Sequence, residues 1–299
     1  MDANACTLCP RMCRVDRNQT LGYCRSSTAI KAARAALHLW EEPCISGTRG
    51  SGTVFFSGCT LRCCFCQNYK ISQENYGKEL SVSRLSQIFL KLQEQGAHNI
   101  NLVTATQYVP GIIKALDLAK PALQIPVVYN CGGYERPETI QMLDGYVDIY
   151  LPDFKYFDPG LSGAYSNAPD YFNVASKAIR AMIDQVGPPE FDSAGDIPLL
   201  KKGVLIRHMV LPGAREDSIR LLHWMKENLP KDHYLISLMS QYTPFYRSKD
   251  YPAINRRITT YEYEKVLDTA IQLGLVHGFM QEKSSAKEEY TPPFQLEGL

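Results

Sequence analysis

The chain has 299 residues, of which 45% are hydrophobic and 21% charged, and its formal net charge is +1. This is the composition of a globular protein with a sizeable core, and so small a net charge excludes a global field that would favour nucleic acid or an anionic membrane as a partner. No stretch approaches the roughly 20 apolar residues of a membrane span, and the N-terminus lacks the apolar region of a secretory signal, so we expect a cytoplasmic protein.

Ten cysteines are many for a cytoplasmic chain, and their grouping indicates metal ligation. Short fixed gaps between cysteines in a reducing compartment favour metal sites over disulfides. The alternative, a secreted protein held by disulfides, is disfavoured because the N-terminus does not have the pattern of a secretory signal. Cys44 and Cys131 stand alone and are expected to be small buried hydrophobic residues. The other eight form two groups, Cys6, Cys9, Cys13 and Cys24, then Cys59, Cys63, Cys64 and Cys66.

The first group has the spacing C-x2-C-x3-C-x10-C. Four thiolates this close together can close a tetrahedral zinc site or hold an iron–sulfur cluster, and the spacing leaves both alternatives open. Either metal would let a short segment fold without a core of its own. A second cluster could pass electrons to another redox centre, whereas an open zinc could bind a substrate thiol.

The next segment, residues 27–43, is rich in alanine and predicts a helix. We therefore expect residues 1–48 to form a cysteine-rich metal module that ends in this helix. A larger domain follows at 49–283, in which 188–202 predict a surface loop. The remaining residues, 284–299, predict a tail that is mobile or draped over the surface.

From residue 52 onward, apolar strand patterns alternate with amphipathic helix patterns. The strand patterns lie at 52–58, 99–106, 125–131, 147–154, 204–213, 233–239 and 277–282. The helix patterns lie at 81–97, 109–120, 136–145, 171–187, 215–230 and 259–274. Such alternation of continuous apolar strands with helices predicts an α/β fold with a parallel sheet covered by helices. The last helix opens with a capping box, Thr259 with Glu262.

Polar residues gather where these strands end. Thr106, Asn130, Asp153 and Gln241 each stand at the carboxyl end of a different strand pattern. In a parallel barrel these ends lie together and form the active-site face. We therefore expect the four side chains to lie around one site.

The second cysteine group follows the first of these strands. Cys59, Cys63 and Cys66 have the spacing C-x3-C-x2-C. Three thiolates on one loop can hold three corners of a cubane 4Fe-4S cluster, which usually takes four cysteines. The iron without a cysteine would then be open, and it can chelate the amino and carboxylate groups of S-adenosylmethionine (SAM). We expect Cys64 to be a bystander that faces away from the cluster.

With Phe65 as the aromatic residue before the last cysteine, the loop resembles the signature of the radical SAM superfamily. The stretches EEPCISGTRGSGTVFFSGCTLRCCFCQN, NLVTATQYVP, VYNCGGYE, DIYLPDFKY and RHMVLPG resemble a branch related to pyruvate formate-lyase activating enzyme. The resemblance covers roughly residues 5–285. It implies a partial (β/α)6 barrel of the TIM type and a 4Fe-4S cluster that reductively cleaves SAM to a 5′-deoxyadenosyl radical, which removes a hydrogen atom from substrate.

The resemblance also nominates residues near the amino group of SAM. Glycyl-radical activating enzymes place a Gly-Gly-Glu stretch at the second strand, where this chain has Thr104 and Thr106. At the next strand they carry Asp-Thr-Asn-Gly, of which Asn130 and the glycines after Cys131 correspond here. Thr104, Thr106 and Asn130 are thus expected to bind the cofactor.

Three later strand ends supply the remaining expected cofactor contacts. The stretch LPDFK resembles the Leu-Asp-x-Lys of activating enzymes, which places Asp153 and Lys155 at the cofactor carboxylate or an adjoining cation. The strand IRHMVLPG resembles their strand ending in Val-Pro-Gly, which nominates Arg207. Gln241 stands near the position of their later histidine.

The resemblance implies a radical SAM oxidoreductase supplied with electrons by a donor such as flavodoxin or ferredoxin. The first expected substrate class is a glycine on a partner glycyl-radical enzyme. Radical modification of a peptide or a small metabolite is the alternative. A hypothesis of another class is a non-catalytic iron–sulfur protein that transfers electrons or binds metal, against which the intact cysteine triplet argues.

Overall fold

The computed structural model describes residues 5–195, 197–281 and 292–299. Its strands are β1 (Ile30–His38), β2 (Ser51–Phe56), β3 (Lys78–Leu80), β4 (Ile100–Val103), β5 (Val127–Cys131), β6 (Ile149–Pro152), β7 (Glu190–Asp192), β8 (Leu199–Met209), β9 (Leu235–Met239) and β10 (Gly278–Met280). Its α-helices are α1 (Pro43–Ser46), α2 (Tyr69–Ser72), α3 (Val82–Glu94), α4 (Val109–Ala119), α5 (Pro137–Met142), α6 (Pro159–Ser166), α7 (Tyr171–Val186), α8 (Arg215–Asn228) and α9 (Thr260–Gln272). None of these helices is long and apolar enough to span a membrane.

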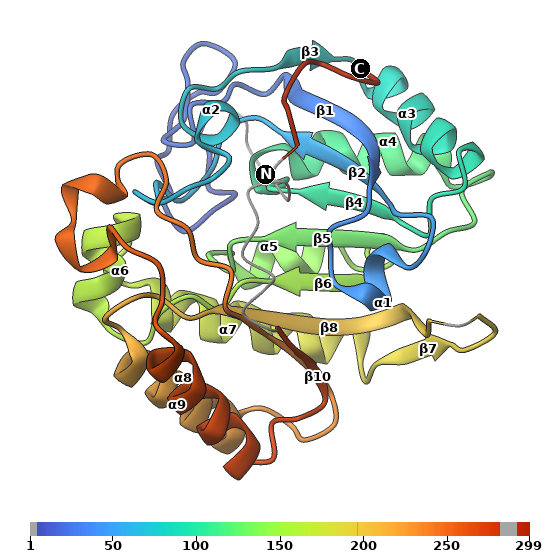
Figure 1. The fold of residues 1–299 in the computed structure, drawn as a ribbon. Coiled ribbons are helices and arrows are strands. Elements are labelled where there is room, and N and C mark those ends of the chain that lie inside the picture. The colour runs from blue at the N-terminus through green and yellow to red at the C-terminus, as the bar shows by residue number, and fades with distance from the viewer. Residues whose placement is uncertain (1–4, 196, 282–291) are drawn as a thin grey trace.

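One curved sheet carries the fold, with the strand order β10-β9-β8-β6-β5-β4-β2-β1-β3 and with β7 paired to β8 (Figure 1). Along this order all neighbours from β2 to β10 are parallel. β1 runs antiparallel to both β2 and β3, and β7 runs antiparallel to β8. The strands β2, β4, β5, β6, β8 and β9 are each followed by a covering helix, α3, α4, α5, α7, α8 and α9 respectively. This confirms the predicted α/β fold, a partial (β/α)6 barrel.

Two helices, α3 and α9, begin at the N-terminal capping residues that the sequence predicts. The Ser81 side chain accepts a hydrogen bond from the backbone N–H of Arg84 at the start of α3. At α9 the Thr259–Glu262 capping box is present in full. Such caps satisfy N–H groups that have no partner inside the helix, and each contributes about 1 kcal/mol.

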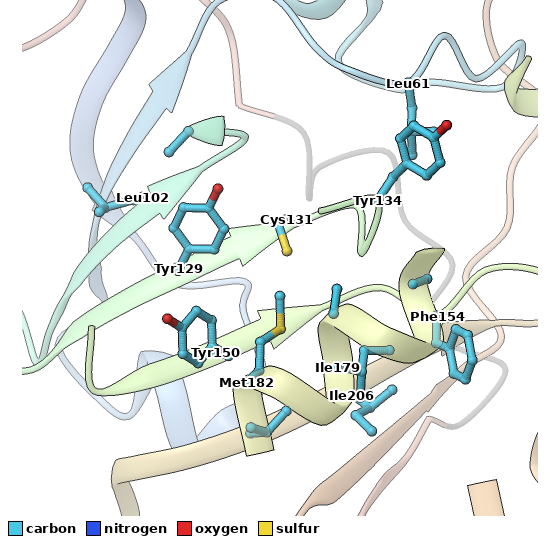
Figure 2. Close-up of a cluster of buried hydrophobic side chains, with 14 of the residues drawn as sticks. Leu61, Leu102, Tyr129, Cys131, Tyr134, Tyr150, Phe154, Ile179, Met182 and Ile206 are labelled. Atoms are coloured by element: carbon cyan, nitrogen blue, oxygen red, sulfur yellow. The ribbon is translucent and has the colours of Figure 1, made fainter. Parts of the chain in front are cut away.

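The outer core lies between the sheet and the helices. Figure 2 shows Tyr129 and Cys131 of β5 and Tyr150 of β6 close to Ile179 and Met182 of α7. The ring centroids of Tyr129 and Tyr150 are 6.0 Å apart in an edge-on arrangement. Burial of an apolar side chain such as Ile179 or Met182 contributes about 1.5–3 kcal/mol. Cys131 is therefore a core residue, as predicted.

A second, smaller core fills the inside of the barrel at the end away from the strand carboxyl termini. Cys44 and Ile45 of α1 are buried there with Val128, Leu151 and Leu205 from three strands. Cys44 is thus a buried hydrophobic residue, as expected. Helix α1 thus forms a plug at this end of the barrel, and the residues directly before α1 enter the barrel with it.

Two secondary-structure predictions are wrong. Residues 30–38, expected in the helix at 27–43, form strand β1, because antiparallel pairing with β2 and β3 outweighs the helix propensity of alanine. Residues 188–202, expected as a loop, contain β7 and the start of β8, which pair as Phe191 with Leu200.

The segment before β1, residues 5–29, has no helix or strand and packs on the barrel. At the other end, the backbone N–H of Leu296 donates to Ala33 and that of Ala35 donates to Glu297, so residues 292–299 lie along β1. The rest of the predicted tail, 284–291, lies outside the described residues. The predicted boundaries after residues 48 and 283 stay predictions.

Candidate functional site

A cavity of about 270 Å³ lies at the carboxyl ends of the parallel strands. Strands β2, β4, β5, β6, β8 and β9 all contribute to its wall through the residues at or just after their ends. Of the residues predicted to bind the cluster or SAM, all but Thr106 line it. They are Cys59, Cys63, Phe65, Cys66, Thr104, Asn130, Asp153, Lys155, Arg207 and Gln241.

The loop that carries the cysteine triplet is held at its start and in its middle. Gln107 Nε2 donates to the carbonyls of Ser57 and Gly58, at 2.9 and 3.2 Å. Gly58 has φ +82°, and a Cβ there would lie 2.5 Å from the Cys24 carbonyl oxygen, so only glycine fits. Further along, the Cys64 backbone N–H donates to the Tyr165 carbonyl at 2.8 Å. These contacts hold the start and the middle of the loop against the barrel.

Each of the three thiols predicted to bind the cluster has a polar group close to its sulfur. The Leu61 N–H donates to Cys59 Sγ at 3.4 Å, and Ser166 Oγ donates to Cys63 Sγ at 3.0 Å. Ser72 Oγ lies 3.2 Å from Cys66 Sγ. Hydrogen bonds to the sulfurs are typical of cysteines that ligate iron–sulfur clusters. The sulfur environment therefore fits such a cluster.

Burial and mutual repulsion act on the same thiols. Burial raises the pKa of Cys66 to about 11, and the nearby Cys63 adds to the rise. Burial also raises the pKa of Cys59, again with a contribution from Cys63. Thiolates packed together out of water need a positive partner, which a metal cluster supplies. Cys64 does not line the cavity and packs in the core, as predicted.

A network of buried charges forms another wall of the cavity. Asp153 lies between Arg207 Nε, at 3.0 Å, and Lys155 Nζ, at 2.6 Å. Arg207 also donates to Asn130 Oδ1 at 2.6 Å and contacts Glu41 Oε2 at 3.3 Å. Burial opposes ionisation of Asp153, but the charges of Arg207 and Lys155 outweigh it and hold the pKa below its usual value. The strand ends position this network, because Asp153 pairs with Arg207 directly after β6.

The two threonines predicted near the amino group of SAM lie in different places. Thr104 lines the cavity at the end of β4 with φ +57°, which is rare for a β-branched residue and is found at functional sites. Its backbone N–H donates to the Asn130 carbonyl at 2.9 Å. Thr106 is instead buried outside the cavity, where its hydroxyl donates to Glu135 Oε1 at 2.7 Å. Only Thr104 is therefore brought to the cavity.

Phe65 and Gln241 line the cavity from two different loops. Phe65 packs edge-on against Tyr242, with ring centroids 5.7 Å apart, which fixes the ring beside the cysteines. Gln241 follows β9, and its side-chain oxygen accepts from Gln281 Nε2 at 3.4 Å. Their roles toward the cofactor stay predictions.

The sequence reasoning missed a group of lining residues at the end of β1. His38, Trp40 and Glu41 all face the cavity. The imidazole of His38 is buried, which lowers its pKa to about 4, and it packs edge-on against Phe55. Glu41 Oε1 accepts from Asn130 Nδ2 at 3.2 Å. The available signal was the acidic pair Glu41 and Glu42 before Pro43, which lies in the segment predicted to be a helix.

Comparisons with known proteins bear on the family of the chain. The family model of the radical SAM superfamily matches residues 53–187. MJ0674, an uncharacterized protein of Methanocaldococcus jannaschii, is 30% identical over 280 residues, which are 90% of this chain and 75% of that protein. The cavity, the cysteine loop and these matches define a radical SAM protein. The chain belongs to the radical SAM superfamily, whose members use a 4Fe-4S cluster and SAM.

One similar solved structure, with a TM-score above 0.5, supports the fold. Methylornithine synthase (PylB) is 13% identical with a TM-score of 0.51, over 88% of this chain and 74% of that chain. SuiB of Streptococcus suis, bound to its precursor peptide, is 12% identical with a TM-score of 0.49, over 75% of this chain. The chain spans less than half of SuiB, 46% of its length.

Proposed function

We propose that this protein reductively cleaves SAM and uses the product radical to remove a hydrogen atom from a substrate. The observation that carries the proposal is the placement of three cysteine thiols and a buried ion network around one cavity at the strand carboxyl ends. When bound, the cluster supplies the one electron that splits a C–S bond of SAM into methionine and a 5′-deoxyadenosyl radical.

The chain's own residues hold and orient the reactants. Cys59, Cys63 and Cys66 would bind three irons of the cluster and leave the fourth open. Lys155 lines the cavity, and among the described residues Asp153 is its one ion-pair partner, so its remaining N–H donors suit the SAM carboxylate. Thr104 lies at the edge of the same space and suits the amino group.

The first substrate class we propose is a glycine on a partner glycyl-radical enzyme. Trp40 lines the cavity and is 52% exposed, and Leu39 beside it is 54% exposed. Exposed aromatic and aliphatic side chains at the cavity rim suit contact with a protein, which needs a surface on the order of 800 Å² per partner. Capture of a glycyl-radical enzyme by the anaerobic protein, and a SAM-dependent glycyl radical signal in that enzyme, would support this class. SAM cleavage stimulated only by small molecules would refute it.

The chemistry itself is tested without knowledge of the substrate. Anaerobic protein reduced with dithionite and mixed with SAM should yield 5′-deoxyadenosine and methionine. The variant Cys59→Ala/Cys63→Ala/Cys66→Ala should yield neither. Cys64→Ala is the matched control, because Cys64 lies in the same loop but outside the cavity, and it should retain the activity. Equal product from the triple variant would overturn the proposal.

A further inference from the structure

The four N-terminal cysteines share one site. Cys6, Cys9 and Cys24 are each 7% exposed, although the segment around them has no helix or strand. The sulfurs of Cys24 and Cys13 lie 3.3 and 3.6 Å from the point that a Cβ of Gly22 would occupy. None of the four is in a disulfide. Buried thiols at the centre of a segment without a core of its own are typical of a metal site that holds the segment together.

A buried arginine lies against this site. Arg17 is 3% exposed, and its guanidinium donates to Cys6 Sγ at 3.8 Å. Its other acceptors are backbone carbonyls, namely those of Ser26 at 3.2 Å, Ser27 and Gln107 at 2.7 Å. Carbonyl oxygens carry no formal charge, so within the part of the chain that the structure describes these bonds give the cation no countercharge. A buried cation is costly without one. Thiolates bound to a metal would supply that charge, and N–H donors to sulfur tune iron–sulfur centres.

The arrangement suits a cluster better than a single ion. A zinc ion needs four sulfurs converging at about 2.3 Å on one point. Among the described residues, no three His, Cys, Asp or Glu side chains converge in this way on one metal ion. A cubane cluster differs because each thiolate binds its own iron, so the cysteines stand further apart around it.

The N-terminal site lies directly behind the loop of the cysteine triplet. The Cys24 carbonyl oxygen lies 2.5 Å from the Cβ position of Gly58, the residue before Cys59. Arg62 of the triplet loop donates to the Tyr23 carbonyl at 2.8 Å. The backbone segments that carry the two groups of cysteines are therefore in direct contact. Electron tunnelling falls steeply with distance, so two redox centres in these positions would exchange electrons readily.

We propose that Cys6, Cys9, Cys13 and Cys24 hold a second iron–sulfur cluster, which relays electrons to the cluster held by the triplet. A reductant of the flavodoxin or ferredoxin class loses one electron to the second cluster, which passes it on and returns to its oxidised state. The electron ends in the C–S bond of SAM, where sulfur leaves with an electron pair as methionine and carbon keeps one electron. The relay, though not the presence of the cluster, rests on the proposed function.

The presence of the cluster is tested in the variant Cys59→Ala/Cys63→Ala/Cys66→Ala, purified anaerobically. We expect about four irons and four sulfides per chain and an electron paramagnetic resonance (EPR) signal on reduction. One zinc per chain, or no metal after reconstitution, would overturn the proposal. Because this variant lacks the triplet, the result holds even if the wild type fails to cleave SAM, which would refute only the proposed function.

The relay is tested with Cys13→Ser, at the least buried of the four cysteines, and with Cys44→Ser as a control in the barrel plug. With dithionite, which reduces the triplet cluster directly, Cys13→Ser should cleave SAM at the wild-type rate, which also shows that it is folded. With reduced flavodoxin it should lose most of its rate, while Cys44→Ser keeps it. An equal loss with both reductants, or no loss with either, would overturn the relay.

Discussion

Replacing Arg207 by methionine should destabilise the protein strongly and in a pH-dependent way. The Arg207 side chain is 15% exposed and contacts Asp153 at 3.0 Å and Glu41 at 3.3 Å. Its loss leaves the buried Glu41 without its main countercharge and leaves Asp153 with Lys155 alone. Breaking a buried ion pair on one side costs about 3–5 kcal/mol. Anaerobic urea unfolding at about pH 7.5, with metal content matched to the wild type, should show a loss of this size.

The pH dependence follows from the carboxylates left behind. Burial already raises the pKa of Glu41, and Arg207 is the largest influence that lowers it. In Arg207→Met the folded-state pKa rises further, so stability is present at low pH and is lost as pH increases above about 4.5, the value in the unfolded chain. The loss should therefore be smaller at about pH 5.5 than at about pH 7.5, and adding Glu41→Gln should restore part of it. A small, pH-independent loss that is additive with Glu41→Gln would refute this reasoning. Arg247→Met, at an exposed arginine, is the control and should show no resolvable change.

Three further predictions concern positions around the site and the helices. Gly133→Ala should lower SAM cleavage and reduce the free energy of unfolding by about 1–3 kcal/mol, because φ is +76° and the new Cβ would overlap the Asp153 carbonyl oxygen. Gly145→Ala is its control, because Gly145 has φ +73° with open space around it, so this variant measures the effect of the backbone conformation alone. Thr259→Ala should cost about 1 kcal/mol in urea unfolding through loss of the α9 cap. Burial lowers the pKa of His208 to about 4, so wild-type stability should fall as pH drops from about 6.5 to about 4, by at most about 1.4 kcal/mol per pH unit. His208→Gln should remove this slope in unfolding experiments across that pH range.

A control variant accompanies each of these three substitutions. If Gly133→Ala and Gly145→Ala lose the same free energy of unfolding, the overlap with Asp153 adds nothing to the effect of the backbone, which would contradict the first prediction. An unchanged unfolding midpoint in Thr259→Ala, compared with Thr269→Ala within the same helix, would contradict the role of the cap. If exposed His223→Gln alters the acid slope as much as His208→Gln does, the slope does not come from burial of His208.

Much of the fold was predictable because its signals are local. Apolar strands that alternate with amphipathic helices predict a parallel sheet wherever they occur, and Thr259 with Glu262 marks a helix start without reference to the rest of the chain. β1 was not predictable in the same way. Its alanine-rich segment favours a helix, and only pairing with β2 and β3, which are remote in sequence, makes it a strand.

In the candidate site, too, the residues marked by a local pattern were predictable and those placed by tertiary packing were not. The spacing of Cys59, Cys63 and Cys66 is local, and the structure brings all three to the cavity. The family resemblance nominates Thr104 and Thr106 equally, but the left-handed backbone at Thr104 and the contact of Thr106 with Glu135 depend on tertiary packing. Glu41 reaches the network only because α1 plugs the barrel, which no local pattern shows.

The most direct test of the account is the EPR spectrum of the dithionite-reduced protein with and without SAM, measured in the wild type and in Cys59→Ala/Cys63→Ala/Cys66→Ala. If the triplet holds a cluster with one open iron, SAM should change the spectrum of the wild type and leave that of the variant unchanged. A wild-type spectrum that SAM does not alter would contradict the assignment of this cavity as the site where SAM is bound and cleaved.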